Sequence, residues 1–312
     1  MHFMKSILSE INEYARRDPA GLIAESDRNY RKSIREIARH IADDDNIKIV
    51  AVAGPSGSGK TTTAHILCEA LKEMQEIIAV ASLDDFYLPA DRLPILSDGS
   101  QDLESVAALD TALIRERFTS YLNTGVLQLP KYEFATQRQI PVAQTLQLGE
   151  RGIVIVEGLH AMNPEITDLV PREIIYKIYI STNQKIRDDE GNVLLDGRRQ
   201  RLVRRVLRDE IFRDADVNET LCMWENVIRG EEKFLYCFKD TADVRLKTLH
   251  FYEPGVFRNR FLKSAEGLAE NTPCREYFLQ TVEAVRQFVP IAAELVPENS
   301  LIREFIGEGK YR

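Results

Sequence analysis

The chain has 312 residues, of which 44% are hydrophobic and 29% are charged, and 41 Lys and Arg against 49 Asp and Glu give a formal net charge of −8. This balance argues against a general nucleic-acid or anionic-membrane surface, and no uncharged apolar run approaches the ~20 residues of a membrane span. The proportions are those of a soluble, folded protein with one large α/β domain or two smaller units.

The cysteines and the first residues bear on the cellular compartment. The N-terminal stretch has mixed charges and no long apolar segment, so we expect no signal peptide and a cytoplasmic location. There is no CxxC pair and no His at zinc-ligand spacing, so we expect no zinc site or disulfide framework but reduced, mostly buried thiols. The cysteines are Cys68, Cys222, Cys237 and Cys274.

Helical and extended patterns alternate along the chain. Residues 1–45 predict two helices around Asp18-Pro19, since apolar residues recur there at spacings of three and four. A basic amphipathic helix is expected over Arg198–Ile211, and a helical tail is expected from Tyr277 to Val296. Short, β-branched apolar runs predict buried strands, which alternate with helices and so indicate a parallel, doubly wound sheet. These runs are Ile47–Ala53, Ile77–Leu83, Ile153–Val156, Ile174–Ile180 and Ala242–Leu246.

A phosphate-binding loop follows the first predicted strand. Residues 54–61 match G-x-x-x-x-G-K-[ST] at every defined position, between a strand and a helix, which disfavours a mere Gly-rich turn. Glycines let backbone N–H groups converge on phosphate oxygens, and the helix N-terminus adds positive potential. Lys60 is expected to reach the β/γ-phosphates and Thr61 to supply a hydroxyl to Mg²⁺. The residues expected to bind ATP are Gly54, Pro55, Ser56, Gly57, Ser58, Gly59, Lys60, Thr61, Thr62 and Arg205.

Carboxylates follow the next two predicted strands. Asp84 and Asp85 come after the second strand and Glu157 ends the third. Ligands of open α/β sheets bind at these strand ends, so we expect a Mg²⁺-side site there. The alternative for the Asp pair is a turn or helix-capping role. Adjacent residues of an extended segment point in opposite directions, so only one of the pair can face the phosphates.

Seven arginines within sixteen positions form a cluster in a chain that is acidic overall. They are either a solvated helix face or the guanidinium groups of a closing lid, which would stabilise charge in phosphoryl transfer. These residues are Arg198, Arg199, Arg201, Arg204, Arg205, Arg208 and Arg213.

Together these elements resemble the uridine kinase and phosphoribulokinase family of P-loop kinases, and best its bacterial uridine kinase-like branch, over roughly residues 45–250. In this family an Asp-Ser-Phe-Tyr motif ends the second strand, so the resemblance implies that Asp84 is the catalytic base and a Mg²⁺-side carboxylate and that Tyr87 lies against the substrate. The segment Asp102–Asp110 is similar to the family's sugar-binding segment, with Asp102 as the contact. Pro130-Lys-Tyr132-Glu-Phe134 resembles the motif of its substrate hairpin, which implies a substrate contact for Tyr132.

The resemblance also assigns the third strand end and the lid. Glu157-Gly158 looks like the family's Glu-Gly, which supports a metal role for Glu157, and Arg201–Asp209 reproduces the motif of its lid helix. Arg205, Arg208 and Arg213 are then expected to contact phosphate and substrate, with Arg208 also catalytic. The implied fold is a P-loop NTPase with a five-stranded parallel sheet flanked by helices and an Arg-rich lid around residues 183–215.

Two departures from the family concern recognition of a base. Gln137 stands where uridine-cytidine kinases have a base-contacting His, and ungapped alignment places Met223 where they have a Gln. Gln137 can still donate and accept hydrogen bonds, so we assign it to the substrate site. Met223 cannot replace an amide. These departures leave the phosphoryl chemistry intact but weaken the nucleoside assignment.

We therefore expect an ATP- and Mg²⁺-dependent kinase with an alcohol group as acceptor, uridine kinase-like, acting on the 5′-hydroxyl of a nucleoside. The alternatives are a sugar-phosphate or other small-alcohol kinase of the phosphoribulokinase type, and a regulatory protein that binds ATP without catalysis. The expected parts are an N-terminal helical extension (1–45), a kinase domain (46–250) and a C-terminal helical extension packed on it (251–312). ATP and a small acceptor are the expected partners, without nucleic acid or membrane, and self-association into a homo-oligomer stays open.

Overall fold

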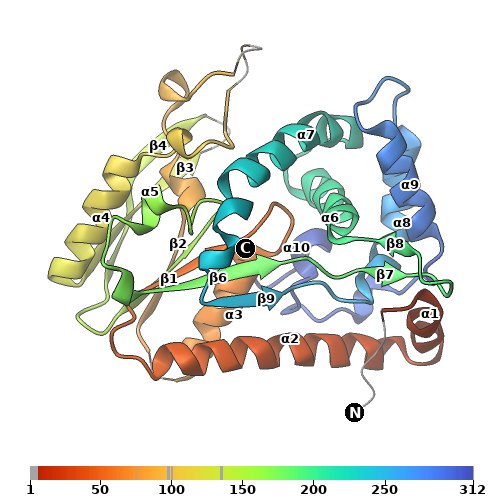
Figure 1. Cartoon of the computed structure of the whole chain (residues 1–312), viewed down its shortest axis with the longest axis horizontal. Helices are drawn as coiled ribbons and strands as arrows, with labels where there is room; N and C mark the ends of the chain where they lie inside the picture. The colour runs from red at the N-terminus through yellow and green to blue at the C-terminus, as the bar shows by residue number, and fades with distance from the viewer. Residues whose placement is uncertain (1–5, 75, 97–98, 100, 134–135, 312) are drawn as a thin grey trace.

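The computed structural model of this chain describes residues 6–74, 76–96, 99, 101–133 and 136–311 (Figure 1). Its α-helices are α1 (Leu8–Arg17), α2 (Pro19–Ala42), α3 (Lys60–Glu73), α4 (Thr111–Thr124), α5 (Pro164–Thr167), α6 (Gly197–Phe212), α7 (Val217–Phe234), α8 (Glu253–Ser264), α9 (Arg275–Arg286) and α10 (Arg303–Ile306). Its strands are β1 (Ile49–Ala53), β2 (Ile78–Ser82), β3 (Val126–Glu133), β4 (Arg138–Gln147), β5 (Ile153–Glu157), β6 (Ile175–Ser181), β7 (Ile186–Arg187), β8 (Val193–Leu195) and β9 (Val244–Lys247).

The central sheet has five parallel strands in the order β2-β5-β1-β6-β9. Every residue of β1 and β5 is buried, because helices cover both faces of the sheet, and all of these residues except Glu157 are apolar. The predicted five-stranded P-loop fold is therefore confirmed. The ends of β1, β2 and β5 lie side by side, since Glu157 pairs with Val52 on one neighbour and with Ser82 on the other.

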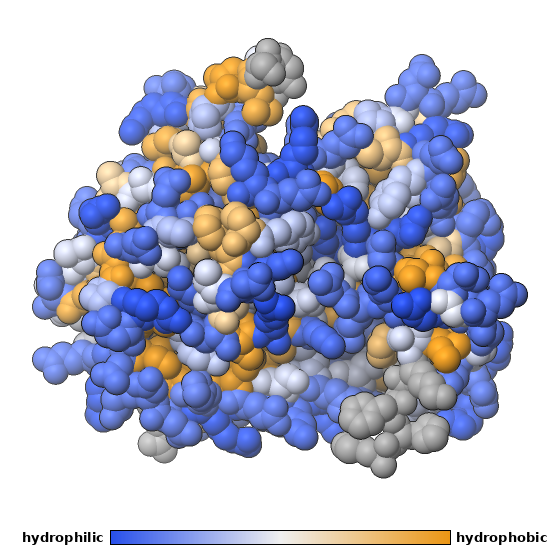
Figure 2. Space-filling view, in the orientation of Figure 1, coloured by the Kyte–Doolittle hydropathy of each residue, from blue (hydrophilic) through white to orange (hydrophobic). Residues whose placement is uncertain are grey.

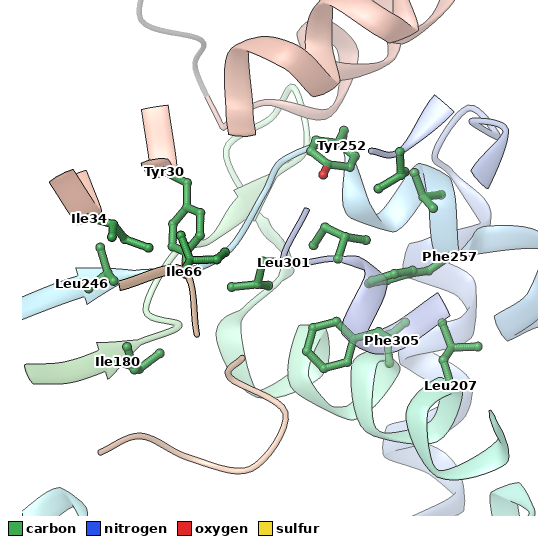
Figure 3. Packing of buried hydrophobic residues seen from close by; sticks show 14 of the residues in the cluster. Tyr30, Ile34, Ile66, Ile180, Leu207, Leu246, Tyr252, Phe257, Leu301 and Phe305 are labelled. Carbon is green, nitrogen blue, oxygen red and sulfur yellow. The ribbon is translucent and has the colours of Figure 1, made fainter. Parts of the chain in front are cut away.

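The segments at the two ends of the chain share a hydrophobic core with the sheet. One buried cluster joins residues of α1, α2 and α3 to residues of α8, α9 and α10. Figure 3 shows Tyr30 of α2 near Ile66 of α3, while Leu301 and Phe305 of the C-terminal segment lie between these helices and α6. Both ends of the chain therefore pack around the beginning of α3.

Three expectations need correction. The α-helix predicted from Tyr277 to Val296 ends at Arg286, because Pro290 lacks an N–H and disfavours helical backbone in the residue before it, and only a short 3₁₀ helix at Ala293–Leu295 follows within that range. Asp84 and Asp85 lie in a 3₁₀ turn over Leu83–Phe86, not on extended backbone. Most of the thiols are not buried: Cys68 is, whereas two of the others are exposed and one is half-buried.

The space-filling view is notched at its top, between the loop that follows β2 and the α8–α9 connection (Figure 2). Hydrophilic side chains cover most of this face, and α7 runs across it below the notch. Among the described residues no helix is both long enough and apolar enough to cross a membrane.

Candidate active site

The loop between β1 and α3 has the backbone of a phosphate cradle. Gly57 and Gly59 have φ angles of 71° and 86°, a left-handed conformation that favours glycine. Gly59 is also crowded, since a Cβ there would lie 2.8 Å from a methyl group of Leu301. The Nζ of Lys60 donates to the carbonyl oxygen of Pro55 at 3.1 Å, so its ammonium group lies over the loop. The N-terminus of α3 thus presents N–H groups and a cation together.

Segments distant in the sequence also contact this loop and the helix that follows it. Ser58 is buried, and its carbonyl oxygen accepts a hydrogen bond from the Thr248 hydroxyl at 2.7 Å. The Thr62 hydroxyl donates to Glu304 of α10 at 2.6 Å. The C-terminal segment therefore contacts the first turn of α3 directly, at a predicted ATP-binding residue.

Glu157 lies at the centre of three strand ends. Its Oε1 accepts hydrogen bonds from the Ser82 hydroxyl at 2.7 Å and the Thr61 hydroxyl at 3.3 Å. Burial and the nearby charge of Asp84 raise the pKa of Glu157 to about 7, and Lys60 opposes this rise. Asp84 itself is exposed. Two mutually repelling carboxylates, Asp84 and Glu157, thus lie beside the phosphate cradle together with the Lys60 ammonium group.

These groups could supply some of the ligands of a Mg²⁺ ion whose other ligands are phosphate oxygens and water. Thr61, Asp84 and Glu157 offer oxygen atoms, which Mg²⁺ prefers, and the mutual repulsion of the carboxylates would be relieved by a cation. In the described part of the chain no three His, Cys, Asp or Glu side chains gather into a metal cage. Phosphate oxygens and water would therefore have to supply the other ligands.

The adjacent carboxylates Asp84 and Asp85 have different surroundings. Asp85 faces the β3–β4 hairpin, where its Oδ1 accepts from the backbone N–H of Tyr132 at 3.3 Å and pairs with the Lys131 ammonium group at 3.0 Å. Asp84 lies close enough to Glu157 to influence its pKa. The turn therefore directs one carboxylate to the hairpin and leaves the other near Glu157.

The arginines of α6 converge on a buried carboxylate. Asp209 is fully buried, and its oxygens lie 3.3 Å from Arg205, 2.7 Å from Arg208 and 3.5 Å from Arg213. Arg205 also donates to the Ser56 hydroxyl at 2.8 Å, and burial lowers its pKa to about 10. A purely solvated face does not describe this helix. Asp209 holds the three guanidinium groups as a set beside the phosphate cradle.

A cavity of about 360 Å³ lies between α7 and the loop before α4. Tyr87 and Tyr132 form an aromatic pair nearby, with ring centroids 5.6 Å apart, and the Tyr87 hydroxyl donates to the Leu103 carbonyl oxygen at 2.9 Å. The cavity wall combines apolar side chains with acidic and basic groups, which lie on opposing elements. Its lining residues include Asp102, Glu104, Arg205, Met223, Asn226, Arg229 and Lys233.

Comparison with known proteins matches residues 49–250 to the phosphoribulokinase / uridine kinase family. The chain belongs to this family. It is 26% identical over 199 residues to a uridine kinase of Mycoplasma genitalium, covering 64% of this chain and 84% of that protein, and 24% identical over 198 residues to one of Clostridium botulinum, covering 63% and 85%. The family and these relatives identify the chain as a kinase, that is, a phosphotransferase.

Solved structures show a more distant likeness. A possible uridine kinase from Bacillus stearothermophilus has 16% identity and a TM-score of 0.47, with 69% of this chain and 98% of that chain covered. A putative fructose transport system kinase from Silicibacter has 15% identity and a TM-score of 0.48, with 68% and 98% covered.

In this member of the phosphoribulokinase / uridine kinase family, the residues discussed for acceptor recognition do not all line the cavity. Met223 lines the cavity, whereas Gln137 is exposed at the hairpin turn, with a φ of 51°, and is not among the lining residues. Asp102 lines the cavity, but its Oδ1 is engaged by the N–H groups of Glu104 and Ser105, both at 3.2 Å. Phe134 of the hairpin motif lies outside the described residues.

Glu104 is a candidate that the sequence analysis missed. Glu104 lines the cavity, and burial raises its pKa to about 7, while the charges of Arg205, Glu231, Lys60 and Asp84 also act on it. Glu104 and Asp102 belong to the same acidic segment. The sequence therefore pointed to this segment. Only the folded loop shows that the carboxylate of Asp102 is used for the loop's own turn, whereas that of Glu104 is not.

Proposed function

We propose that this kinase transfers the γ-phosphoryl group of ATP to a hydroxyl of a small acceptor, and that the acceptor is a nucleoside. One observation carries the proposal: the P-loop, Asp84 and Glu157 meet at the ends of three neighbouring parallel strands, within electrostatic reach of Glu104 in a cavity lined by both charged and apolar groups. A protein that only binds ATP would not need an acceptor cavity at this position.

The chemistry can be assigned to the residues present. Backbone N–H groups of the 54–62 loop and Lys60 would bind the phosphates, while Thr61, Asp84 and Glu157 would hold Mg²⁺, which supplies neutralisation of phosphate charge. Asp84 would orient the acceptor hydroxyl and accept its proton. Arg205, Arg208 and Arg213 would stabilise the charge that develops on the transferred group, with Asp209 keeping them in position.

On the acceptor side, we propose that Glu104 accepts hydrogen bonds from sugar hydroxyls, with Asp102 shaping the loop around it. Replacing Glu104 by Gln is expected to raise the acceptor KM by about 10-fold or more, because a charged acceptor of hydrogen bonds is lost, while the Kd for ATP stays unchanged. Asp102→Asn is the comparison, and steady-state kinetics with calorimetry of ATP binding measures both. A larger acceptor effect at Asp102 would return the role to that residue.

The raised pKa of Glu104 gives the same proposal a pH signature. Because the pKa is about 7, the carboxylate form fills as the pH rises from 6 to 8, and the acceptor KM should fall over that interval. In Glu104→Gln this part of the pH dependence should be absent.

A sugar phosphate is the second candidate acceptor, and the charge of the cavity favours it. Arg205, Arg229 and Lys233 line the same space as Glu104 and could bind an anionic group. A screen of ATP consumption over nucleosides, pentoses, sugar phosphates and other small alcohols tests both candidates. If no hydroxyl compound stimulates ATP consumption, the kinase proposal loses its acceptor.

In that screen we expect weak selectivity for pyrimidine nucleosides. The thioether of Met223 at the cavity wall can contact a base but cannot hydrogen-bond its edge as an amide would, and unpaired polar groups are what make such pockets selective. A kcat/KM for uridine or cytidine about a thousandfold above all purine nucleosides and other alcohols would contradict this expectation.

A further inference from the structure

Ser56, the third residue of the phosphate-binding loop, is bound through all three of its polar groups. Its backbone N–H donates to Glu231 at 2.8 Å, its carbonyl oxygen accepts from Arg201 at 3.0 Å, and its hydroxyl accepts from Arg205 at 2.8 Å. These partners come from α6 and α7, far from the loop in sequence. The conformation of the loop is therefore held from outside.

Two of these partners form a buried ion pair. The Nη1 of Arg201 lies 2.6 Å from Oε1 of Glu231, and the two side chains are 2% and 0% exposed. The other oxygen of Glu231 accepts from the Tyr236 hydroxyl at 3.1 Å, and the Arg201 guanidinium group lies 5.5 Å from the Trp224 ring centroid. Burial of two charges is costly and their pairing adds little net stability, so stability alone does not explain the pair.

We infer that Arg201 and Glu231 are positioning residues for the nucleotide, an inference that rests on the proposed ATP-dependent function. By fixing the N–H and the carbonyl group of Ser56, the pair sets the direction in which the chain enters the turn at Gly57. The N–H groups that follow then converge on the phosphates. A cradle of backbone donors depends on such preorganisation, because a displacement of about 1 Å can cost about 100-fold in rate.

The test compares double variants of two ion pairs that join the same helices. Arg201→Met with Glu231→Leu replaces the buried pair by apolar side chains of similar size, an exchange that often preserves stability. It removes both hydrogen bonds to the Ser56 backbone. The control is Arg198→Met with Glu232→Leu, because these residues form an exposed pair at 3.0 Å, also between α6 and α7. Melting temperature, the Kd for Mg·ADP by calorimetry, and KM and kcat with ATP are measured.

We expect the buried double variant to melt near the wild-type temperature but to bind Mg·ADP at least about 10-fold more weakly. The fold-increase in the KM for ATP should be larger than the fold-decrease in kcat. Glu231→Gln should fall between this variant and the wild type, because the amide oxygen can still accept from Ser56. The control pair should change none of these values. If the buried double variant does not fold, Glu231→Gln against the control decides the question.

Nucleotide affinity in the buried double variant, or in Glu231→Gln, equal to that of the control would overturn the inference. Failure of the proposed function would look different, because it would appear in the wild-type protein itself. A wild type that binds neither Mg·ADP nor ATP, or that binds them but phosphorylates no acceptor, would contradict the kinase proposal, and in the second case the Kd comparison would still test the inference.

Discussion

Replacing Asp84 by Asn is expected to lower kcat by about 10²–10⁴-fold while ATP affinity is largely retained. Asp84 is the exposed carboxylate beside Glu157, and an amide in its place can still contact the acceptor hydroxyl but cannot accept its proton. Steady-state ATP turnover with the acceptor found in the screen, together with calorimetric ATP binding, measures both quantities.

Asp85→Asn is the matched control for this prediction, since Asp85 is the next residue of the same turn. Its carboxylate is bound to Lys131 and to the backbone of Tyr132, so its loss should loosen the hairpin and affect the acceptor KM more than kcat. A loss of kcat at Asp85 that equals or exceeds that at Asp84 would exchange the two roles.

Replacing Lys60 by Ala is expected to reduce turnover by about 10²-fold or more, because it removes a positive charge aimed at the transferred phosphoryl group. The Lys60 ammonium group also opposes the rise of the Glu157 pKa, so its loss should leave the Glu157 carboxyl group less able to ionise near neutral pH. ATP turnover at saturating acceptor and the Kd for ATP are the measurements.

Lys72→Ala provides the control on the same helix, since Lys72 is exposed in the last turn of α3, away from the phosphate cradle. It should leave turnover and ATP affinity unchanged. Turnover in Lys60→Ala within a few-fold of the wild type would show that the 54–61 loop is not the phosphate site of the reaction.

Much of the architecture follows from local patterns in the sequence. The apolar, β-branched runs over residues 47–53 and 153–156 specify strands that can be stable only between two layers, and the structure places them at the centre of the sheet. The Gly-rich loop needs positive φ angles and a following helix, and both are consequences of neighbouring residues. The fold and the conformation of this loop were therefore predictable because short-range interactions determine them.

Tertiary structure alone decided which of two similar residues faces the site and what holds the site in place. Of Asp84 and Asp85, it is Asp85 that binds the β3–β4 hairpin. Of Asp102 and Glu104, it is Asp102 whose carboxylate is engaged by the turn of its own loop. The support of Ser56 by Glu231 joins residues 175 positions apart, and the contact of Thr62 with Glu304 spans 242. No local pattern encodes such contacts, because a buried carboxylate gains a partner only when the packing of distant helices brings one within hydrogen-bond distance.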